Sequence, residues 1–147
     1  MSMGPIHDSM TPRSRGAALI EFALVLPFLF VVTFAVVDLS RAYYLKNMLR
    51  AAARQGCRVA AVLPNPSAGA DYDSVYVRVT KVLQPTGLTV TTGDVVVTAP
   101  TTSQYKVQVT TQFNWLYLGL FNLFGASGIT NPQTLTASAV MKNEGGS

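Results

Sequence analysis

A single carboxylate, Glu21, interrupts the most apolar stretch of this sequence. An ionisable side chain inside a membrane segment is costly and is usually kept for a function, so Glu21 is the first candidate functional residue. Gly16 and Ala17 precede it in the sequence. If the chain were cut between them, the new amine of Ala17 would lie about one helical turn before the Glu21 carboxylate. The two opposite charges would then share one apolar environment, where each lowers the cost of burying the other.

The segment that carries Glu21 is long and apolar enough to cross a bilayer. Residues 17–37 contain fourteen Leu, Ile, Val or Phe residues and a single ionisable group. As a helix they span roughly 31 Å, which matches a hydrocarbon core of about 30 Å. The fourteen large apolar residues favour insertion by roughly 4–8 kcal/mol, which outweighs one Glu near the end of the span. Pro27 predicts a kink in this helix, with a hinge as the alternative.

The residues from Gly16 to Phe22 resemble a known processing signal. A Gly, small residues and then Glu-Phe at the head of an apolar helix are similar to the class III prepilin signal of bacterial type IV pilus-like systems. The minor pseudopilins of tight-adherence systems, the TadE-like family, match best. Two later segments also resemble that family in the expected order: the small-residue and Arg segment 51–61 and the closing segment 135–144.

The resemblance implies that the chain is processed. A prepilin peptidase of the membrane would remove a cytoplasmic leader, residues 1–16, by cutting between Gly16 and Ala17. Arg13 and Arg15 would hold this leader at the cytoplasmic face. The mature protein would then begin with its transmembrane helix.

The resemblance also implies a role in assembly for Glu21 and Phe22. Glu21 would neutralise an N-terminal amine, its own or that of a neighbouring subunit. The partners would be other pilins or pseudopilins and the inner-membrane assembly platform. The implied function is that of a minor pseudopilin in the assembly of a tight-adherence (Flp, type IVb) pilus, a system of adhesion and biofilm formation. The alternatives are an unprocessed single-pass membrane protein whose external β-rich module binds a ligand or partner, and a secreted protein whose signal peptide is cut after Ala35.

Two lines of reasoning give opposite orientations for the span. The positive-inside rule counts Lys and Arg near each end of a span. Two such residues precede the span and five follow it: Arg13 and Arg15, then Arg41, Lys46, Arg50, Arg54 and Arg58. This count favours a cytoplasmic C-terminal part, whereas the resemblance implies the reverse. We follow the resemblance and expect a single-pass protein of the bacterial inner membrane with its module outside the cytoplasm. Whether the protein also enters the surface pilus is left open.

Residues 38–63 continue at helical spacing outside the membrane, without an internal Pro. Basic residues recur there at every fourth position and form a basic ridge: Lys46, Arg50, Arg54 and Arg58. Ala52, Gly56 and Ala60 lie roughly opposite, in two small-xxx-small steps that let another backbone approach closely. The approaching backbone belongs either to another subunit or to the chain's own sheet. The two kinds of packing can also occur together.

We expect the basic ridge to be solvated or to face another subunit, rather than to bind nucleic acid. No aromatic residues alternate along the ridge in the pattern that stacks on bases, so nucleic acid is not expected. Tyr43 and Tyr44 fall where an aromatic belt would meet the membrane surface. Arg41 and Lys46 can reach lipid headgroups from the same region.

The remaining residues, 64–147, are expected to form an extracytoplasmic α+β module. A break rich in Pro and Gly covers residues 63–70. The pattern of residues 71–84 is ambiguous, and we favour a helix over a strand. Alternating or β-branched residues predict strands at residues 88–91, 94–99, 105–113 and 135–141. The predicted fold class is α+β and pilin-like, with a long N-terminal transmembrane and amphipathic helix packed on a small antiparallel β-sheet.

Residues 113–129 carry no charge and are rich in Leu, Phe, Tyr and Trp. They are too short and too rich in Gly and Asn for a second span. We favour a short helix that dips into the membrane interface or docks on a partner subunit. Burial under the sheet is the alternative.

The sequence lacks the residues that catalysis or metal binding needs. The one His, His7, lies in the predicted leader, and the one Cys, Cys57, has no intramolecular partner. We expect Cys57 to be a small packing residue, with an intermolecular disulfide as the alternative. Asp71 and Asp73 are too few for a calcium site, and no phosphate-binding motif occurs. We therefore expect no enzyme, no cofactor and no metal.

Overall fold

The computed structural model describes residues 12–101, 103–118, 122, 125, 128 and 130–143, with side chains from residue 16 onward. The chain divides into two compact units, Met1–Val37 and Asp38–Ser147. The side chains of Arg13 and Arg15 and most of the leader lie outside the described residues.

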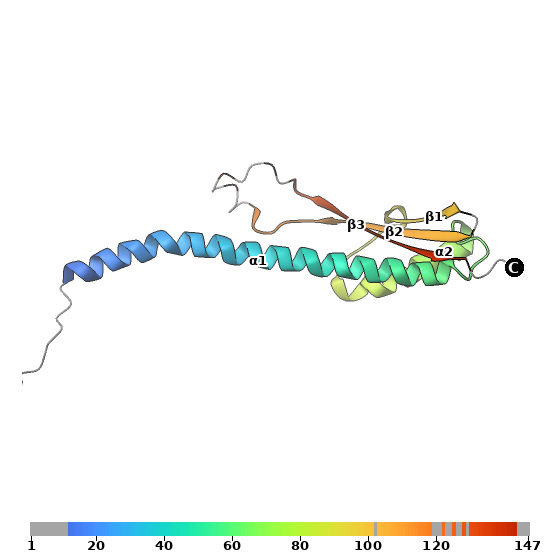
Figure 1. Ribbon diagram of the computed structural model, residues 1–147, viewed down its shortest axis with the longest axis horizontal. Coiled ribbons are helices and arrows are strands. Elements are labelled where there is room, and N and C mark those ends of the chain that lie inside the picture. The colour runs from blue at the N-terminus through green and yellow to red at the C-terminus, as the bar shows by residue number, and fades with distance from the viewer. Residues whose placement is uncertain are drawn as a thin grey trace, which may run out of the picture. The chain divides into compact units, whose positions relative to one another are not determined.

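One helix, α1, runs through both units from Pro12 to Ala60 (Figure 1). In the first unit it is apolar and its large side chains are exposed, with Leu24 at 75% and Phe28 at 65%. Pro27 lies inside the helix and does not end it. Within the described residues, α1 is the helix that is long and apolar enough to cross a membrane.

The second unit contains a three-stranded antiparallel sheet in the order β1-β2-β3. The strands are β1 (Val95–Thr101), β2 (Gln104–Phe113) and β3 (Gln133–Lys142). A second helix, α2, spans Gly69–Leu83, which confirms the helix favoured for residues 71–84. The predicted α+β fold, with a long N-terminal helix and a small antiparallel sheet, is confirmed.

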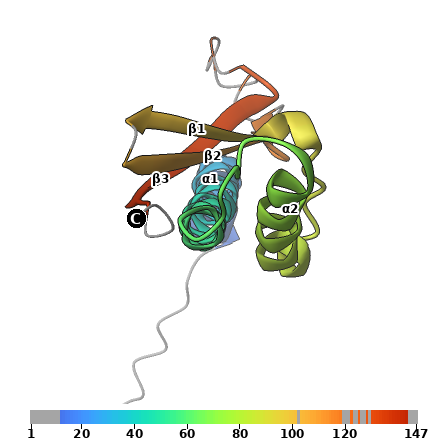
Figure 2. The same ribbon diagram turned by 90° about the vertical axis from the view of Figure 1, so that its right-hand side faces the viewer.

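Alternation along the strands divides the sheet into a buried and an exposed face. In β2, Val107, Val109, Thr111 and Phe113 are buried, while Gln108, Thr110 and Gln112 between them are partly or fully exposed. The second half of α1 and α2 both lie against the buried face (Figure 2). Apolar burial between these three elements forms the core of the module: Leu49, Ala52, Ala53, Cys57, Ala60, Val75, Val79, Leu83, Val90, Val95, Val97, Val107, Val109 and Ala137.

The predicted strand over residues 88–91 is wrong. These residues form no strand and are followed by a short 3-10 helix, Thr92–Asp94. The hydroxyl of Tyr76 donates to the carbonyl of Val90 at 2.8 Å, and the Asp94 carboxylate accepts from the backbone N–H of Thr91 at 2.8 Å. Side chains therefore satisfy two of the backbone groups that a strand ladder would have used, the carbonyl of Val90 and the N–H of Thr91.

Gly56 lies where α1 packs closely against α2 and β2. A Cβ at this position would lie 2.8 Å from Val79 Cγ2 and 3.2 Å from Val107 Cγ1, closer than normal packing allows at Val79. Val79 is β-branched and lies in a helix, so its side chain has one strongly preferred rotamer and cannot easily move aside. The backbones of the three elements can meet at this distance because residue 56 has no side chain.

We predict that Gly56→Ala destabilises the module although alanine is the better helix former. Overpacking costs about 1–3 kcal/mol, which exceeds the roughly 1 kcal/mol gained from helix propensity. Each net 1 kcal/mol should lower the melting temperature by about 4–8 °C, measured by circular dichroism of the full chain in detergent.

Two variants serve as controls for this prediction. Gly93→Ala, where the added Cβ meets only Thr91 Oγ1 at 3.9 Å, should leave the melting temperature nearly unchanged. Val79→Ala should cost less in the Gly56→Ala background than in the native protein, because it relieves the overlap. Additive costs in that double-mutant cycle would refute the packing argument.

Candidate functional site

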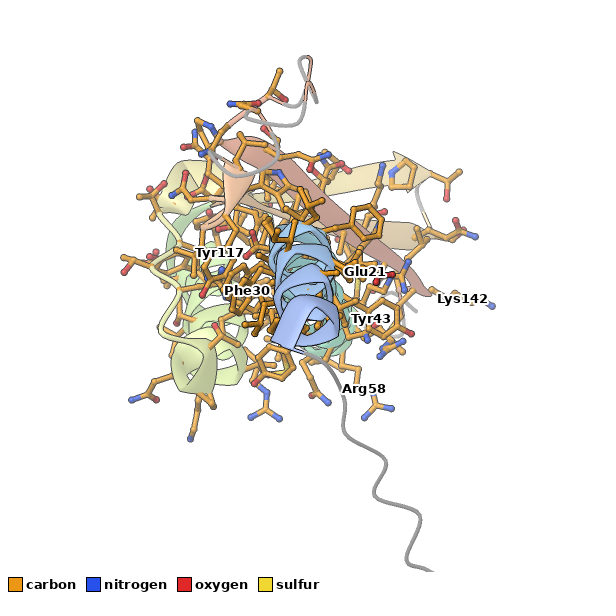
Figure 3. The ribbon with its side chains drawn as sticks, turned by 90° about the vertical axis from the view of Figure 1, so that its left-hand side faces the viewer. Glu21, Phe30, Tyr43, Arg58, Tyr117 and Lys142 are labelled. Atoms are coloured by element: carbon orange, nitrogen blue, oxygen red, sulfur yellow. The ribbon has the colours of Figure 1, made fainter. Side chains whose placement is uncertain are left out.

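The residues of the predicted prepilin signal lie on the exposed first part of α1. Glu21 projects from the helix (Figure 3) and shares a shallow groove with Ala18, Phe22 and Val25. Among the residues described from Gly16 onward, none forms a hydrogen bond or an ion pair with its carboxylate. The backbone from Pro12 onward is helical, so the peptide bond between Gly16 and Ala17 lies inside α1. The carboxylate is thus exposed and has no partner among the described side chains.

The small residues of α1 face the chain's own module. Ala52 and Ala60 are fully buried, and Gly56 faces Val79 of α2 and Val107 of β2. The close backbone approach that their spacing permits is therefore used within the subunit. This side of α1 is covered and is not available to a second subunit in this fold.

Cys57 lies beside these small residues and joins α1 to the sheet. Its thiol donates to the carbonyl of Ala139 at 3.0 Å and accepts from the N–H of Val107 at 3.3 Å. The residue is fully buried, and burial raises the pKa of the Cys57 thiol, an effect that the hydrogen bond from Val107 partly opposes. A covered thiol without thiolate character is a packing and hydrogen-bonding group, and it cannot pair with another chain unless the module opens.

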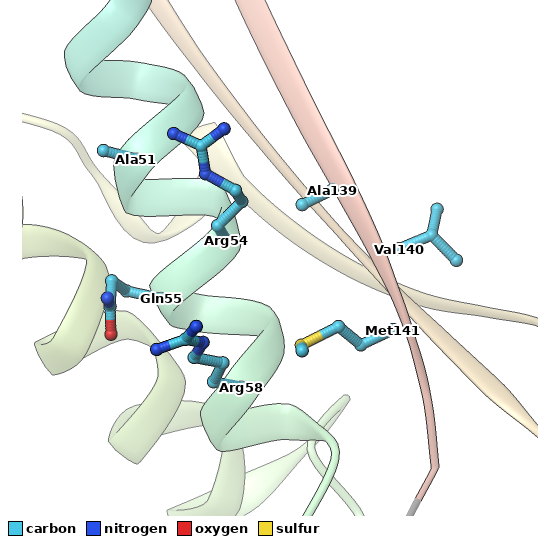
Figure 4. Close-up of a pocket in the computed structure, with 7 residues that line it drawn as sticks. All are labelled: Ala51, Arg54, Gln55, Arg58, Ala139, Val140 and Met141. Atoms are coloured by element: carbon cyan, nitrogen blue, oxygen red, sulfur yellow. The ribbon is translucent and has the colours of Figure 1, made fainter.

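The basic ridge lies on the exposed side of α1, and two of its members line a groove. Arg54 and Arg58 of α1 line this groove together with β3, where Met141 points toward the helix and Val140 points away from it (Figure 4). The groove has a volume of about 310 Å³ and is completed by Ala51, Gln55 and Ala139. Two guanidinium groups beside a strand edge can bind a carboxylate or a phosphate oxygen.

A buried carboxylate that the sequence analysis did not single out lies at the start of the second unit. Asp38 is fully buried, and its two oxygens accept hydrogen bonds from different parts of the chain. Oδ1 accepts from Arg41 Nη1 at 3.2 Å, and Oδ2 accepts from the backbone N–H of Tyr117 at 3.0 Å. Asp38 and Arg41 are three residues apart on α1, which is the signal that could have suggested the pair from the sequence.

Aromatic side chains pack against Arg41, the ion-pair partner of Asp38. The guanidinium of Arg41 lies 5.5 Å from the centre of the Phe113 ring, within the range of a cation–π contact. Trp115 packs edge-on against Phe113, with ring centres 5.0 Å apart. The indole N–H of Trp115 is covered and has no acceptor among the described residues.

Most of the predicted interfacial segment, residues 113–129, lies outside the described residues. Its first part is described: after β2 ends at Phe113, Trp115 and Tyr117 are partly buried and Leu116 is 62% exposed. Tyr43 and Tyr44, predicted as part of an aromatic belt, are also exposed, at 67% and 51%.

Part of the chain matches a known protein family. Residues 16–58 match the model of a family described as TadE-like protein, which confirms the resemblance to that family. The match begins at Gly16 and ends at Arg58, so it covers the apolar segment and most of the remainder of α1 but not the sheet. No curated protein and no solved structure was found to match the chain. A TadE-like region on a long apolar N-terminal helix fits a membrane protein associated with a tight-adherence pilus.

We predict that Cys57 reacts with a maleimide or disulfide reagent at least about a thousandfold more slowly in the native protein than in denaturant. The thiol is buried, so the reaction requires an opening of the module that is rarely populated. An added cysteine on the exposed loop, Ser67→Cys, provides the matched control, since it should react at the denatured rate in the same sample. Native Cys57 reacting within about tenfold of that control would show that the contact between α1 and the sheet is not maintained.

Proposed function

We propose that this chain is a minor pseudopilin of a tight-adherence pilus machine, cut between Gly16 and Ala17 and anchored by residues 17–37. The observation that carries the proposal is the family match that begins at Gly16, together with an exposed carboxylate at Glu21 on a helix that can span a membrane. The role is structural and non-catalytic. The coarser assignment, a membrane protein associated with such a pilus, rests on the same observations.

The chemistry of Glu21 supports a role in assembly. In lipid, a carboxylate without a partner is strongly disfavoured, and no described residue of this chain provides one. Cleavage would create an amine at Ala17, one helical turn away, and each neighbouring subunit would carry the same amine. Pairing of a carboxylate with an amine in this low-dielectric setting stabilises the packed subunits, since an unpaired charge there is worse than a paired one.

The local structure around Gly16 bears on the processing step. A peptidase needs the scissile bond in an accessible, extended form, whereas the bond after Gly16 is helical in the uncut chain. Glycine costs a helix about 1 kcal/mol relative to alanine, so it lowers the cost of unwinding at this position. A Cβ at Gly16 would meet no atom within 4 Å, so no side-chain packing explains a glycine there.

The pseudopilin proposal also implies where each part of the chain lies relative to the inner membrane. The leader would stay in the cytoplasm for the prepilin peptidase, and the module from Asp38 onward would lie outside the inner membrane. The basic ridge and the groove at Arg54 and Arg58 are then exposed where other pilins, pseudopilins and the assembly platform are expected. No nucleic acid, cofactor or metal takes part in this proposal.

We predict that the mature protein begins at Ala17. N-terminal mass spectrometry of protein purified from membranes should find this start only in cells that contain the prepilin peptidase. The peptidase-deficient strain is the control and should retain the leader. A retained leader in both strains would support the unprocessed single-pass protein, and a start after Ala35 would support a secreted one.

We predict that Glu21→Ala and Glu21→Gln both leave the amount of membrane-inserted protein unchanged and reduce surface pili by at least about tenfold. Both variants remove the charge, whereas Gln keeps the size of the side chain, so the pair separates charge from shape. Thr33→Val is the matched control on the same helix, because its hydroxyl bonds only to the Leu29 carbonyl within the helix. Normal piliation with Glu21→Gln would overturn the charge-pairing role.

A further inference from the structure

The chain that follows β2 is tied to the position on α1 where the apolar segment ends. The backbone N–H of Tyr117 donates to Asp38 Oδ2 at 3.0 Å, although the two residues are far apart in the sequence. Asp38 is fully buried, so this bond is shielded from water. The residues next to Tyr117 are therefore held at the level of residue 38 of the helix.

Arg41 provides the second tie to the same segment. Its guanidinium donates to Asp38 Oδ1 at 3.2 Å and lies 5.5 Å from the centre of the Phe113 ring. Phe113 is almost fully buried and packs against the edge of Trp115. The Asp38–Arg41 ion pair thus holds both ends of the short stretch from Phe113 to Tyr117: Arg41 contacts Phe113, and Asp38 binds Tyr117.

This stretch presents apolar surface outward. Leu116 is 62% exposed, and residues 113–129 contain no charged side chain. On another face of α1, close in sequence to Asp38, Leu39 and Tyr43 are 64% and 67% exposed. Leu116 is thus an exposed leucine held in place by buried polar contacts, and it has no partner among the described residues of the module.

The level of Asp38 relative to a bilayer follows from the sequence. Asp38 directly follows residue 37, the last residue of the apolar segment. If residues 17–37 fill the hydrocarbon core, Asp38 lies at its edge, and the headgroup layer beyond is roughly 5–7 Å deep. A helix rises about 1.5 Å per residue, so this layer covers about four residues, from Asp38 to Arg41.

We propose that residues 114–118 form a second contact with the membrane, in the headgroup layer from which α1 emerges. The Asp38–Arg41 pair holds Leu116 and the apolar surface of Trp115 in that layer. The inference rests on the membrane insertion of α1, which the proposed function also requires. Continuity with the span makes a lipid surface the occupant, and Trp and Tyr are the residues that favour this layer.

The chain contains a single Trp, so the fluorescence of Trp115 reports on this contact directly. The full chain is reconstituted into phosphatidylcholine vesicles that carry bromine near the headgroup end of the acyl chains, near their deep end, or not at all. We expect at least about twofold quenching by the shallow bromines and weaker quenching by the deep ones. Equal emission in all three vesicles would overturn the inference.

Two relocated tryptophans separate failure of this inference from failure of the proposed anchor. In a Trp115→Phe background, Phe30→Trp places the reporter in the span and Val96→Trp places it on exposed β1. Deep quenching at residue 30 with none at residue 115 means that α1 inserts and the second contact is wrong. No quenching at either position means that the membrane anchor itself is wrong. Quenching at residue 96 equal to that at residue 115 would show non-specific adsorption and also overturn the inference.

Two substitutions test the parts assigned to Asp38 and Leu116. Asp38→Asn removes the charge that holds Arg41 and should reduce shallow quenching of Trp115 by at least half. Because that variant can also disturb folding, Leu116→Ser is measured in parallel; it keeps the tie to Asp38 and should weaken quenching by removing the apolar contact. Unchanged quenching in Leu116→Ser would overturn the lipid contact. A Trp115 that is unquenched in vesicles but shielded from acrylamide in the intact pilus machine would instead assign the surface to a protein partner.

Discussion

The close approach of α1 to the sheet is the constraint on which the rest of the module depends. Gly56 brings the helix backbone against Val79 and Val107, and only small residues fit beside it on this side of α1. The same closeness lets the thiol of Cys57 reach backbone groups of β2 and β3. Because one side of α1 is fully used in this way, α1 can offer only its opposite, basic side or its apolar segment to the proposed contacts with other subunits.

Patterns that depend on local burial could be read from the sequence, and those that depend on distant partners could not. The alternation from Tyr105 to Phe113 predicted β2 because one face of that strand is buried along its length. Residues 88–91 are also rich in β-branched residues but are not a strand, since the Tyr76 hydroxyl of α2 binds the carbonyl of Val90 and the Asp94 carboxylate binds the N–H of Thr91. Asp38 was missed because an acid three residues before an arginine usually indicates a solvated surface pair. Its burial depends on Tyr117, which no local pattern connects to it.

Two acids on one helix illustrate how surroundings decide what a carboxylate does. Asp38 is fully buried and has partners for both of its oxygens, so its charge is satisfied within the chain. Glu21 is exposed on an apolar surface and has no partner among the described residues. The first stabilises the subunit's own structure. Under the proposed function, the second is available to an N-terminal amine, its own or that of a neighbouring subunit.

Whether a charge is paired within the chain also matters for the orientation of the span. On that orientation the charge count and the family resemblance disagree. Arg41 is bound to Asp38, so it adds little to the net charge beside the membrane. The remaining basic residues belong to a folded module, Asp38–Ser147, rather than to a short loop. The positive-inside rule applies to loops of up to about 60 residues, whereas longer domains cross the membrane largely regardless of charge. The excess of Lys and Arg after the span therefore carries less weight than its number indicates, and the proposed extracytoplasmic position of the module is compatible with it.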